Sequence, residues 1–432
     1  MKRGVPAITI CSDQFIVLGR KQLKALGAEG QPIAVIPHPF GLRTREEVRA
    51  IAETCVDDIA RIAVDPRAGA ASDKASNGAA RAARVEMPED ADDFDRFCIE
   101  RRWSDGLPLR APTLDKVERM IAASGRAADE VIAVVQPGFG TATVEGIAIN
   151  AVMAGCRPDY VRTLIAAVQA FTDKRFNLQG IQATTNPATA MIIVNGPVTR
   201  EIRINGHLNC LGQGAWANAT LGRALRLIMQ NISGTLPGEM DRATQGRRGK
   251  YTFCCAENEA DSPWEPLHVE RGFDKNDSTV TIVGAAGTVN FNSHAKDAAD
   301  LLKVIANSMC FPTNNDYYFG GEPWLLIEPE HTHILAREGL SKRDVKLKLW
   351  DMSKLHVDRL AAKDRMRLQH TRDAELGQFT ADTKIPISIK PEEVSIICAG
   401  GPGTHSVHVP TFGHTRSVKR KIVSPRACMM SL

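Results

Sequence analysis

Acidic and amide side chains gather within residues 251–271, directly after an apolar run. Glu257, Asn258 and Glu259 follow that run without interruption. A strand that ends in polar residues delivers them to the rim of a pocket, and a carboxylate beside apolar surface has a shifted pKa. General acid–base catalysis uses such groups. The segment therefore favours an enzyme, although it does not name the substrate.

Glu257 and Glu259 are spaced two residues apart. In an extended segment both side chains face one side and Asn258 faces the other. Paired carboxylates can share a proton or hold a divalent metal ion. We therefore expect Glu257 or Glu259 to act as a general base or acid. Asn258 and Trp264 are expected to contact the substrate, since the prolines on either side of Trp264 fix the backbone of that turn.

Cys254 and Cys255 are adjacent on the same predicted strand. Neighbouring strand residues point to opposite faces, so at least one of the two thiols is expected in the core. We take Cys254 as a candidate catalytic thiol. A thiolate needs a nearby cation, and the local candidates are Lys250, His268 and Arg271.

A glycine-rich turn precedes a predicted helix at about residue 219. Backbone amides at such a turn bind anions, so we expect Asn205, Gly212, Gly214 and Asn218 to contact a carboxylate or phosphate. The turn also has Gly-x-Gly-x-x-Ala spacing. No clean strand ends just before it and no acidic residue lies about twenty residues on, so NAD is not expected.

A second glycine-rich turn follows the last predicted strand. Gly401 and Gly403 permit close approach of the backbone to a ligand, and His405 is a candidate general base or ligand. A third turn contains Trp103 and Asp105, which are expected to line a pocket.

Composition excludes several classes of protein. The chain has 432 residues, 43% hydrophobic and 24% charged, which is typical of a globular protein of two or three domains. A net charge of +4 with 5% aromatic residues does not favour nucleic-acid binding. Ten cysteines without a Cys-x-x-Cys pair, no signal peptide and no apolar run long enough to span a membrane indicate a cytoplasmic protein. The basic residues at 416–426 are expected to form a solvated end.

The fold class expected from the pattern is α/β. A strand at 5–11, a helix at 14–26, a strand at 33–36 and a helix opened by a Thr44–Glu47 capping box form a small, partial parallel β-α-β unit over residues 1–65.

A flexible linker at 66–92 and a larger mixed α/β domain at 93–432 follow, with no internal repeat. The strands expected in this domain are 130–135, 190–195, 279–283, 324–328 and 394–399, and the helices are about 114–124, 144–155, 159–172, 219–231, 294–308, 330–338 and 342–369.

Residues 2–9, Phe15, 22–27 and 35–39 resemble the later half of the UGSC family, over about residues 2–50. That family is named for a selenocysteine (or cysteine)-Gly-Ser-Cys motif, which lies upstream of the first strand here and is absent, so no catalytic residue is carried over. The remainder resembles a large uncharacterised bacterial domain without an established reaction, through residues 103–108, 154–158, 251–254 and 256–259.

The resemblance suggests two explanations for a β-α-β unit that starts at residue 1. In one, an upstream selenocysteine codon reads as a stop and the chain begins at the next methionine. In the other, the thiol half of the unit is a separate chain.

Three functions follow from these observations. The first is an enzyme acting on a small anionic organic substrate by acid–base and thiol redox chemistry, as an oxidoreductase or by cleaving C–S or C–X bonds. The second is a non-catalytic binding subunit of a thiol or selenol enzyme complex, completed by a second chain. The third is a lyase or hydratase that holds a divalent metal between Glu257, Glu259 and a histidine. A homo-oligomer is compatible with each.

Overall fold

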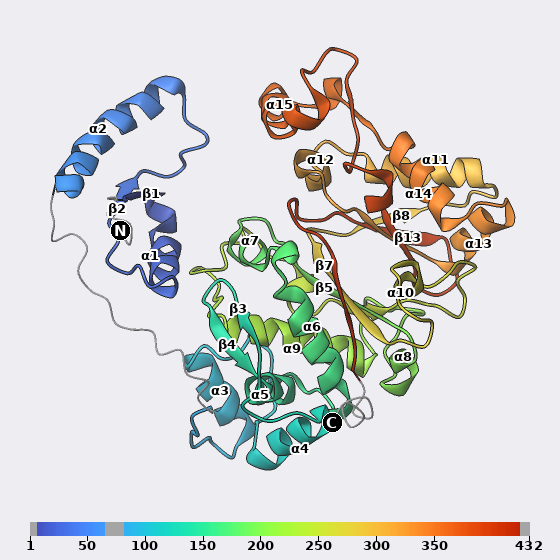
Figure 1. Ribbon diagram of the computed structural model, residues 1–432, viewed down its shortest axis with the longest axis horizontal. Helices are drawn as coiled ribbons and strands as arrows, with labels where there is room; N and C mark the ends of the chain where they lie inside the picture. The colour runs from blue at the N-terminus through green and yellow to red at the C-terminus, as the bar shows by residue number, and fades with distance from the viewer. Residues whose placement is uncertain (1–6, 65–81, 424–432) are drawn as a thin grey trace.

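The N-terminal unit is a parallel β-α-β unit followed by a helix. The structure, a computed structural model, describes residues 7–64 and 82–423 (Figure 1). β1 and β2 pair in parallel, as predicted. The backbone N–H of Thr44 donates to Glu47 Oε2 at 2.7 Å and that of Glu47 to Thr44 Oγ1 at 3.3 Å, which confirms the capping box. The elements are β1 (Thr9–Ser12), α1 (Ile16–Ala25), β2 (Ile33–Ile36) and α2 (Arg45–Val64).

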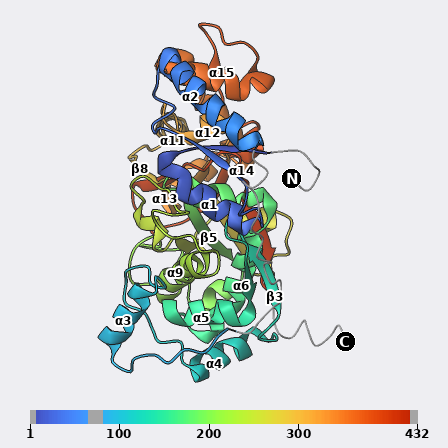
Figure 2. The same cartoon turned by 90° about the vertical axis from the view of Figure 1, so that its left-hand side faces the viewer.

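The helix α1 of this unit faces the rest of the chain (Figure 1), and Figure 2 views the molecule from the side on which the unit lies. Gln22 Nε2 donates to the carbonyl of Pro137 at 3.1 Å, and Lys21 pairs with Glu239. The hydrophobic core of the unit contains few buried side chains. On its two strands, Ile10 is 55% exposed and Val35 is 48% exposed. Its apolar surface is therefore only partly covered by the described residues.

The larger unit is built on two four-stranded mixed sheets. The first has the order β14-β7-β5-β6 and the second the order β12-β9-β13-β8. Two small antiparallel pairs, β3-β4 and β10-β11, lie outside them. The strands are β3 (Val131–Val135), β4 (Gly140–Thr143), β5 (Thr189–Asn195), β6 (Cys254–Ala256), β7 (Thr279–Ala285), β8 (Val289–Asn292), β9 (Trp324–Ile327), β10 (Leu355–His356), β11 (Lys384–Ile385), β12 (Ser395–Cys398), β13 (His405–Val409) and β14 (Val418–Lys421).

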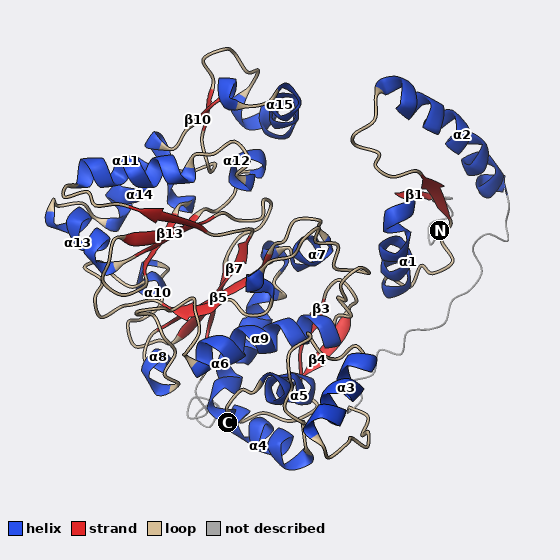
Figure 3. Ribbon diagram, turned by 180° about the vertical axis from the view of Figure 1, so that it is seen from behind, coloured by secondary structure: helices blue, strands red, loops and turns tan. Residues whose placement is uncertain are grey.

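The two sheets pack face to face and each carries helices on its outer face, which gives four layers (Figure 3). Met191 and Ile193 of β5 meet Trp324 and Leu326 of β9 between the sheets. The helices α6 and α9 cover the first sheet and α5 packs against these two helices, whereas α11, α13 and α14 cover the second sheet. The helices are α3 (Ala91–Glu100), α4 (Leu114–Ser124), α5 (Val144–Ala154), α6 (Val161–Phe171), α7 (Leu178–Ala183), α8 (Val198–Glu201), α9 (Trp216–Asn231), α10 (Leu267–Glu270), α11 (Ala298–Met309), α12 (Asn315–Phe319), α13 (Pro329–Arg337), α14 (Lys342–Met352) and α15 (Ala362–Leu376).

The two sheets share one topology. In the first, β5 is parallel to β6 and antiparallel to β7, which is antiparallel to β14. In the second, β9 is parallel to β12 and antiparallel to β13, which is antiparallel to β8. The two sheets exchange one edge strand each. β8 follows β7 of the first sheet along the chain but pairs in the second sheet, and β14 follows β13 of the second sheet but pairs in the first. The larger unit thus contains a repeat of topology that the sequence analysis did not detect.

The expected strands and most expected helices are confirmed, and two predictions are wrong. The predicted helix at 342–369 is interrupted after α14 by β10, because Leu355 is buried and pairs with Ile385. The described part of the basic stretch, up to residue 423, is not a solvated end, since β14 pairs with β7 and Arg420 forms an ion pair with Asp173 at 2.8 Å; Arg426 lies outside the described residues.

The predicted linker falls partly outside the described residues, which resume at residue 82. Residues 82–90 form neither helix nor strand, and α3 begins within the last part of the predicted range. Among the helices of residues 7–64 and 82–423, none is both long and apolar enough to cross a membrane.

Candidate functional site

The carboxyl ends of the parallel strands of both sheets meet at one edge of the larger unit. Glu257 and Asn258 follow β6, and the backbone N–H of Asn258 donates to the carbonyl of Cys398, at the end of β12, at 2.8 Å. Gly400, just beyond β12, donates its N–H to the carbonyl of Gly206 at 2.8 Å. Ligands of open α/β sheets bind at the carboxyl ends of strands. The acidic segment and both glycine-rich turns therefore lie together, where a site is expected.

One amide side chain joins the two predicted catalytic glutamates. Asn195, the last residue of β5, donates from Nδ2 to Glu257 Oε2 at 2.5 Å and to Glu259 Oε1 at 2.9 Å. The backbone N–H of Gly196 also donates to Glu259 Oε1, at 2.7 Å. Both carboxylates thus face the same side, as their spacing predicts. We call Asn195, Glu257, Glu259 and His268 the carboxylate site.

Glu257 is sequestered within the protein. Its side chain is 0% exposed, and its Oε2 accepts a hydrogen bond from the N–H of Leu267 at 2.7 Å. Lys342 Nζ lies 4.0 Å from Oε1, which has no hydrogen-bond partner among the described residues. Burial raises the pKa of Glu257 above its usual value, and the opposing charge of Lys342 does not cancel this effect. Glu257 therefore retains a proton to a higher pH than an exposed glutamate.

Glu259 is the member of the carboxylate site that reaches the surface, with 26% of its side chain exposed. His268 Nδ1 lies 3.7 Å from Glu259 Oε1, and the His268 side chain is 1% exposed. Within the described part of the chain, Nδ1 of His268 and Oδ1 of Asn195 form no hydrogen bond. Buried polar atoms are normally paired with protein groups or with ordered water. The site can hold a proton on Glu257 and present Glu259 as an acceptor.

The predicted substrate-binding amides mostly hold the glycine-rich turns in place. Asn218 Oδ1 accepts from the N–H of Asn205 at 2.8 Å, and its Nδ2 donates to the carbonyls of Asn205 and Cys210. Asn258 Nδ2 donates to Asp261 at 3.0 Å and to the carbonyl of Gly400 at 3.2 Å. These side chains position the turns and leave few hydrogen bonds for a ligand.

The glycines at this edge permit close approach of the chain segments. A Cβ on Gly401 would lie 2.2 Å from the side chain of Leu208, so the two turns touch at this residue. Gly403 has a φ of 156° and Gly214 a φ of 111°. Gly212 lies against Asn209 in the first turn. The two predicted binding turns therefore form one surface beside the acidic segment.

The thiols of β6 are both in the core. Cys254 faces the helical layer and Cys255 the interface between the sheets, and burial raises the pKa of Cys254. Cys210, in the first glycine-rich turn, behaves differently. A hydrogen bond with Cys255, together with backbone amides including that of Gly400, lowers the pKa of Cys210 despite its burial. Cys210 is the thiol that lies beside the turns.

Other predicted site residues lie elsewhere. His405, on β13, is exposed and hydrogen-bonds Asn290 at 3.1 Å, and it is not among the residues that contact the carboxylate pair. Trp264 donates from Nε1 to the carbonyl of Leu340 at 3.0 Å and packs on the core of the second sheet.

Trp103 and Asp105 are in a turn near the end of α9. Trp103 lines a cavity of about 460 Å³ with Phe94, Met153 and other apolar residues. Asp105 forms a two-point ion pair with Arg223, with both distances 2.8 Å. Both residues thus lie beside cavities, but neither contacts the carboxylate site.

Asn195 was not predicted as a site residue, and His268 was not predicted as a neighbour of the carboxylates. The signal for Asn195 was available, because an Asn-Gly-Pro turn follows a strongly apolar strand. His268 was considered only as a partner for a thiolate. Among the described residues, no group of three or more His, Cys, Asp or Glu side chains is arranged to hold a metal ion.

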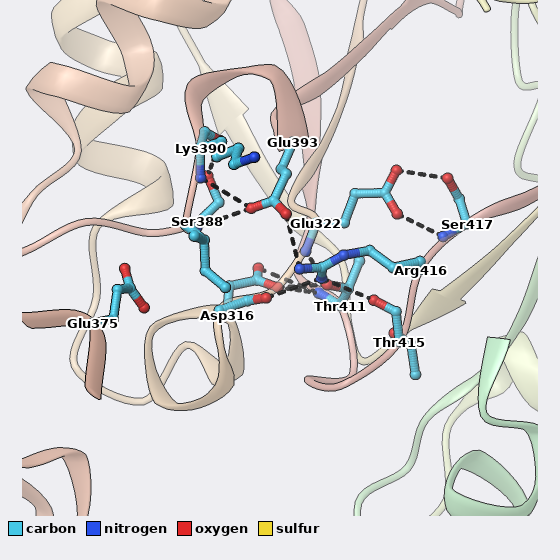
Figure 4. Close-up of polar contacts among 12 residues, drawn as sticks. Asp316, Glu322, Glu375, Ser388, Lys390, Glu393, Thr411, Thr415, Arg416 and Ser417 are labelled. Atoms are coloured by element: carbon cyan, nitrogen blue, oxygen red, sulfur yellow. Dashed lines mark hydrogen bonds and ion pairs between the residues drawn. The ribbon is translucent and has the colours of Figure 1, made fainter. Parts of the chain in front are cut away.

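A separate group of buried carboxylates lies between α12 and the segment that leads to β14 (Figure 4). Asp316 accepts hydrogen bonds from the N–H and Oγ1 of Thr411 at 3.1 and 2.5 Å, and burial raises the pKa of Asp316 to about 7. Glu322 accepts from the N–H and Oγ of Ser417 and from Arg271. These carboxylates are engaged by protein donors, which indicates a structural role.

The fold defines an α/β protein made of a small β-α-β unit and a larger unit of four layers. The small unit is a UGSC-type region, because residues 1–65 match the model of the UGSC family. The match confirms the resemblance seen in the sequence and extends it to the end of α2. No curated protein and no solved structure matches the chain.

Proposed function

We propose that this protein is an enzyme that acts on a small anionic organic molecule by acid–base chemistry and cleaves a C–S or C–X bond. The observation that carries the proposal is the pair of hydrogen bonds from Asn195 Nδ2 to Glu257 and Glu259. In this role Glu259 removes a proton from the carbon next to the substrate carboxylate. Glu257, whose side chain is buried, gives its proton to the leaving group by way of Glu259, the exposed member of the pair, so the products are an unsaturated acid and the protonated leaving group.

In a second form of this proposal the enzyme is an oxidoreductase that uses a thiol. The thiol in this form is that of Cys210 rather than the predicted Cys254. Cys254 is 4% exposed within the core and its pKa is raised by burial, so it remains protonated at neutral pH. Cys210 lies beside the turns and its pKa is lowered by its hydrogen bond with Cys255 and by backbone amides. We place the enzyme in the cytoplasm, because the nine cysteines among the described residues are all free.

The test begins with a search for turnover. The full chain is incubated with organic acids that carry a thioether, halogen or hydroxyl group two carbons from the carboxylate, and released thiol or unsaturated acid is measured by mass spectrometry. Glu257→Gln and Glu259→Gln are then expected to lower kcat by about 10²- to 10⁴-fold. Glu257→Gln keeps an oxygen that can accept from Asn195 and Leu267, so the fold is expected to survive.

Glu118→Gln is the matched control, because Glu118 lies on an exposed face of α4. Its turnover should equal that of the unmodified chain. Unchanged rates in both Glu257→Gln and Glu259→Gln, with folding verified by circular dichroism, would rule out the proposed acid–base roles.

A second candidate function is that of a binding subunit for a thiol or selenol enzyme complex. The observation that favours it is the exposed apolar surface of the two-stranded sheet, with Ile10 55% and Val35 48% exposed. An open sheet edge with apolar neighbours is a site for pairing with another chain. Light scattering of the protein mixed with a separate chain that carries the thiol half of the unit should then show a complex that Val35→Lys weakens. Separate elution of the two chains would contradict it.

A further inference from the structure

A second cavity, of about 500 Å³, lies at the other end of β6 from the carboxylate site. Lys250 and Tyr251, which precede β6, line this cavity, whereas Glu257 follows β6. The lining includes four cationic side chains and two anionic ones. We call it the Arg247 cavity. Its charged side chains are Arg226, Arg247, Arg248, Lys250, Asp105 and Asp241.

One carboxylate, that of Asp241, forms ion pairs with two cationic side chains in this cavity. Arg226 is 8% exposed, and its guanidinium donates to Asp241 Oδ2 at 3.1 Å. Lys250 Nζ donates to both oxygens of Asp241, at 2.6 and 2.7 Å. Burial opposes ionisation of Asp241, but the charges of Lys250 and Arg226 outweigh it and lower the pKa of Asp241. The three groups together leave one positive charge without a partner in the low-dielectric interior.

Arg247 adds a second uncompensated charge. Its guanidinium lies over the ring of Phe253, 5.1 Å from the centroid, and makes one long hydrogen bond, to the carbonyl of Ala285 at 3.4 Å. It forms no ion pair with any carboxylate of the described segments. A guanidinium has five N–H donors, so most of those on Arg247 are available to the cavity. Burial lowers the pKa of Arg247, which shows that its charge is partly desolvated.

Asp105, the second carboxylate among the described lining residues, acts on Arg226 at a distance but does not neutralise this excess. Asp105 is engaged at two points by Arg223, at 2.8 Å each. Arg248 extends the basic surface to the exposed rim. Desolvated cations without carboxylate partners favour an anionic ligand, and the planar guanidinium matches phosphate and carboxylate oxygens in pairs.

We propose that the Arg247 cavity binds a small organic molecule through a phosphate or carboxylate group. The volume lies within the range of about 300–1,000 Å³ that is typical of small-molecule sites, and it exceeds what one inorganic oxyanion needs. Tyr251, 46% exposed, presents an aromatic ring and a hydroxyl at the rim for the organic part of the ligand. The site goes beyond the proposed acid–base function and lies apart from the residues that carry it.

The test is calorimetric titration of the full chain at constant ionic strength. The probes are inorganic phosphate, glycerol 3-phosphate and citrate. Saturable binding is expected, and Arg247→Gln should weaken it by about tenfold or more, since a charge-assisted hydrogen bond is lost. Arg119→Gln, on the surface of α4, is the control and should leave the affinity unchanged. Binding of the phosphate ester alone assigns a phosphate ligand, and binding of citrate alone a carboxylate.

Two results would overturn the proposal. One is the lack of saturable binding for all three probes. The other is an affinity in Arg247→Gln equal to that of the unmodified chain. Should Arg247→Gln fail to fold, Arg248→Gln on the rim replaces it, with an expected loss of affinity of about threefold to tenfold. The measurement needs no turnover, so its outcome is independent of the proposed enzymatic activity.

Discussion

The side-chain nitrogen of Asn195 lies 2.5 Å from Glu257 Oε2 and joins the end of β5 to the segment that follows β6. The two residues are far apart in sequence and become neighbours because β5 and β6 pair in parallel. The amide of Asn195 also separates Glu257 from Glu259 by donating to both. One neutral donor thus allows two carboxyl groups to share a poorly solvated space.

Replacing that donor with a carboxylate should destabilise the protein. Asn195→Asp loses the N–H donor and places a third acidic group beside Glu257 and Glu259. We expect a loss of about 3 kcal/mol or more in the free energy of unfolding at pH 8. The loss should shrink at pH 5, because protonation of one carboxyl group restores a donor and removes repulsion. Urea unfolding at both pH values measures the effect.

Gln378→Glu, which also changes an amide to a carboxylate but at an exposed residue, is the control for this substitution. It should change stability by less than about 0.5 kcal/mol at either pH. A loss in Asn195→Asp that is the same at pH 5 and pH 8 would contradict the electrostatic explanation.

The chemistry of the candidate site could be predicted from sequence only where it is local. The same-side placement of Glu257 and Glu259 follows from their spacing on an extended segment. The Asn-Gly-Pro turn marks Asn195 as the end of a strand, but its contact with the glutamates depends on strand pairing, and that of His268 on the turn into α10. Sequence spacing likewise could not show that the side-chain amide of Asn218 is hydrogen-bonded to the backbone of Asn205 in the turn.

The fold was predictable to a similar extent. Long apolar strands such as β5 and β7 were identified because their whole length is buried. Short or polar strands were not identified from the sequence. The sequence of β14, for example, is typical of a basic surface segment, although this strand pairs with β7 at the edge of the first sheet. The shared topology of the two sheets leaves no sequence repeat, since it depends on which strands pair and on the exchange of β8 and β14.

Asp316 should make stability depend on pH with a definite sign. Burial raises the pKa of Asp316 from 3.8 to about 7 in the folded chain, so the folded state binds a proton between these values more tightly than the unfolded state. Its contribution to stability is therefore complete below about pH 4 and lost as the pH rises to 7, by roughly 4 kcal/mol.

Asp316→Asn removes this dependence. Its Oδ1 can still accept from Thr411, and its Nδ2 would face His408 Nε2, which lies 4.0 Å from the Asp316 carboxylate. Relative to the unmodified chain, the variant should gain stability as the pH rises from 4 to 8, as measured by urea unfolding. Asp351→Asn, at an exposed residue, is the control. Parallel pH profiles for Asp316→Asn and the unmodified chain would contradict the expected titration.

Cys210 should be more reactive than Cys254 at neutral pH. The two thiols are similarly buried, at 6% and 4% exposed, so access differs little between them. The hydrogen bond with Cys255 and backbone amides lower the pKa of Cys210, whereas burial raises the pKa of Cys254. Because the thiolate is the nucleophile, iodoacetamide should modify Cys210 at least about ten times faster. Peptide mass spectrometry over time measures both rates, and faster labelling of Cys254 would contradict the assignment.

Gly206, in the first turn, should tolerate substitution poorly because it lies against rigid backbone. A Cβ at this residue would lie 2.8 Å from the carbonyl oxygen of Ala256 and 2.9 Å from the carbonyl of Glu257, and these backbone atoms cannot rotate away. Gly206→Ala should therefore displace Glu257, lower stability by about 1–3 kcal/mol and reduce any turnover that depends on the carboxylate site. Gly401→Ala should cost less, because its two nearest atoms belong to the side chain of Leu208, a residue that is 67% exposed.

Gly41→Ala provides the matched control, since a Cβ there meets nothing within 4 Å. Melting temperature and urea midpoint should rank the variants with Gly206→Ala least stable, Gly401→Ala intermediate and Gly41→Ala unchanged. The ranking follows from what each new methyl group meets: rigid backbone, an exposed side chain or open space. If Gly206→Ala proved as stable as Gly41→Ala, the close contact between the first turn and the segment after β6, on which the carboxylate site depends, would be disproved.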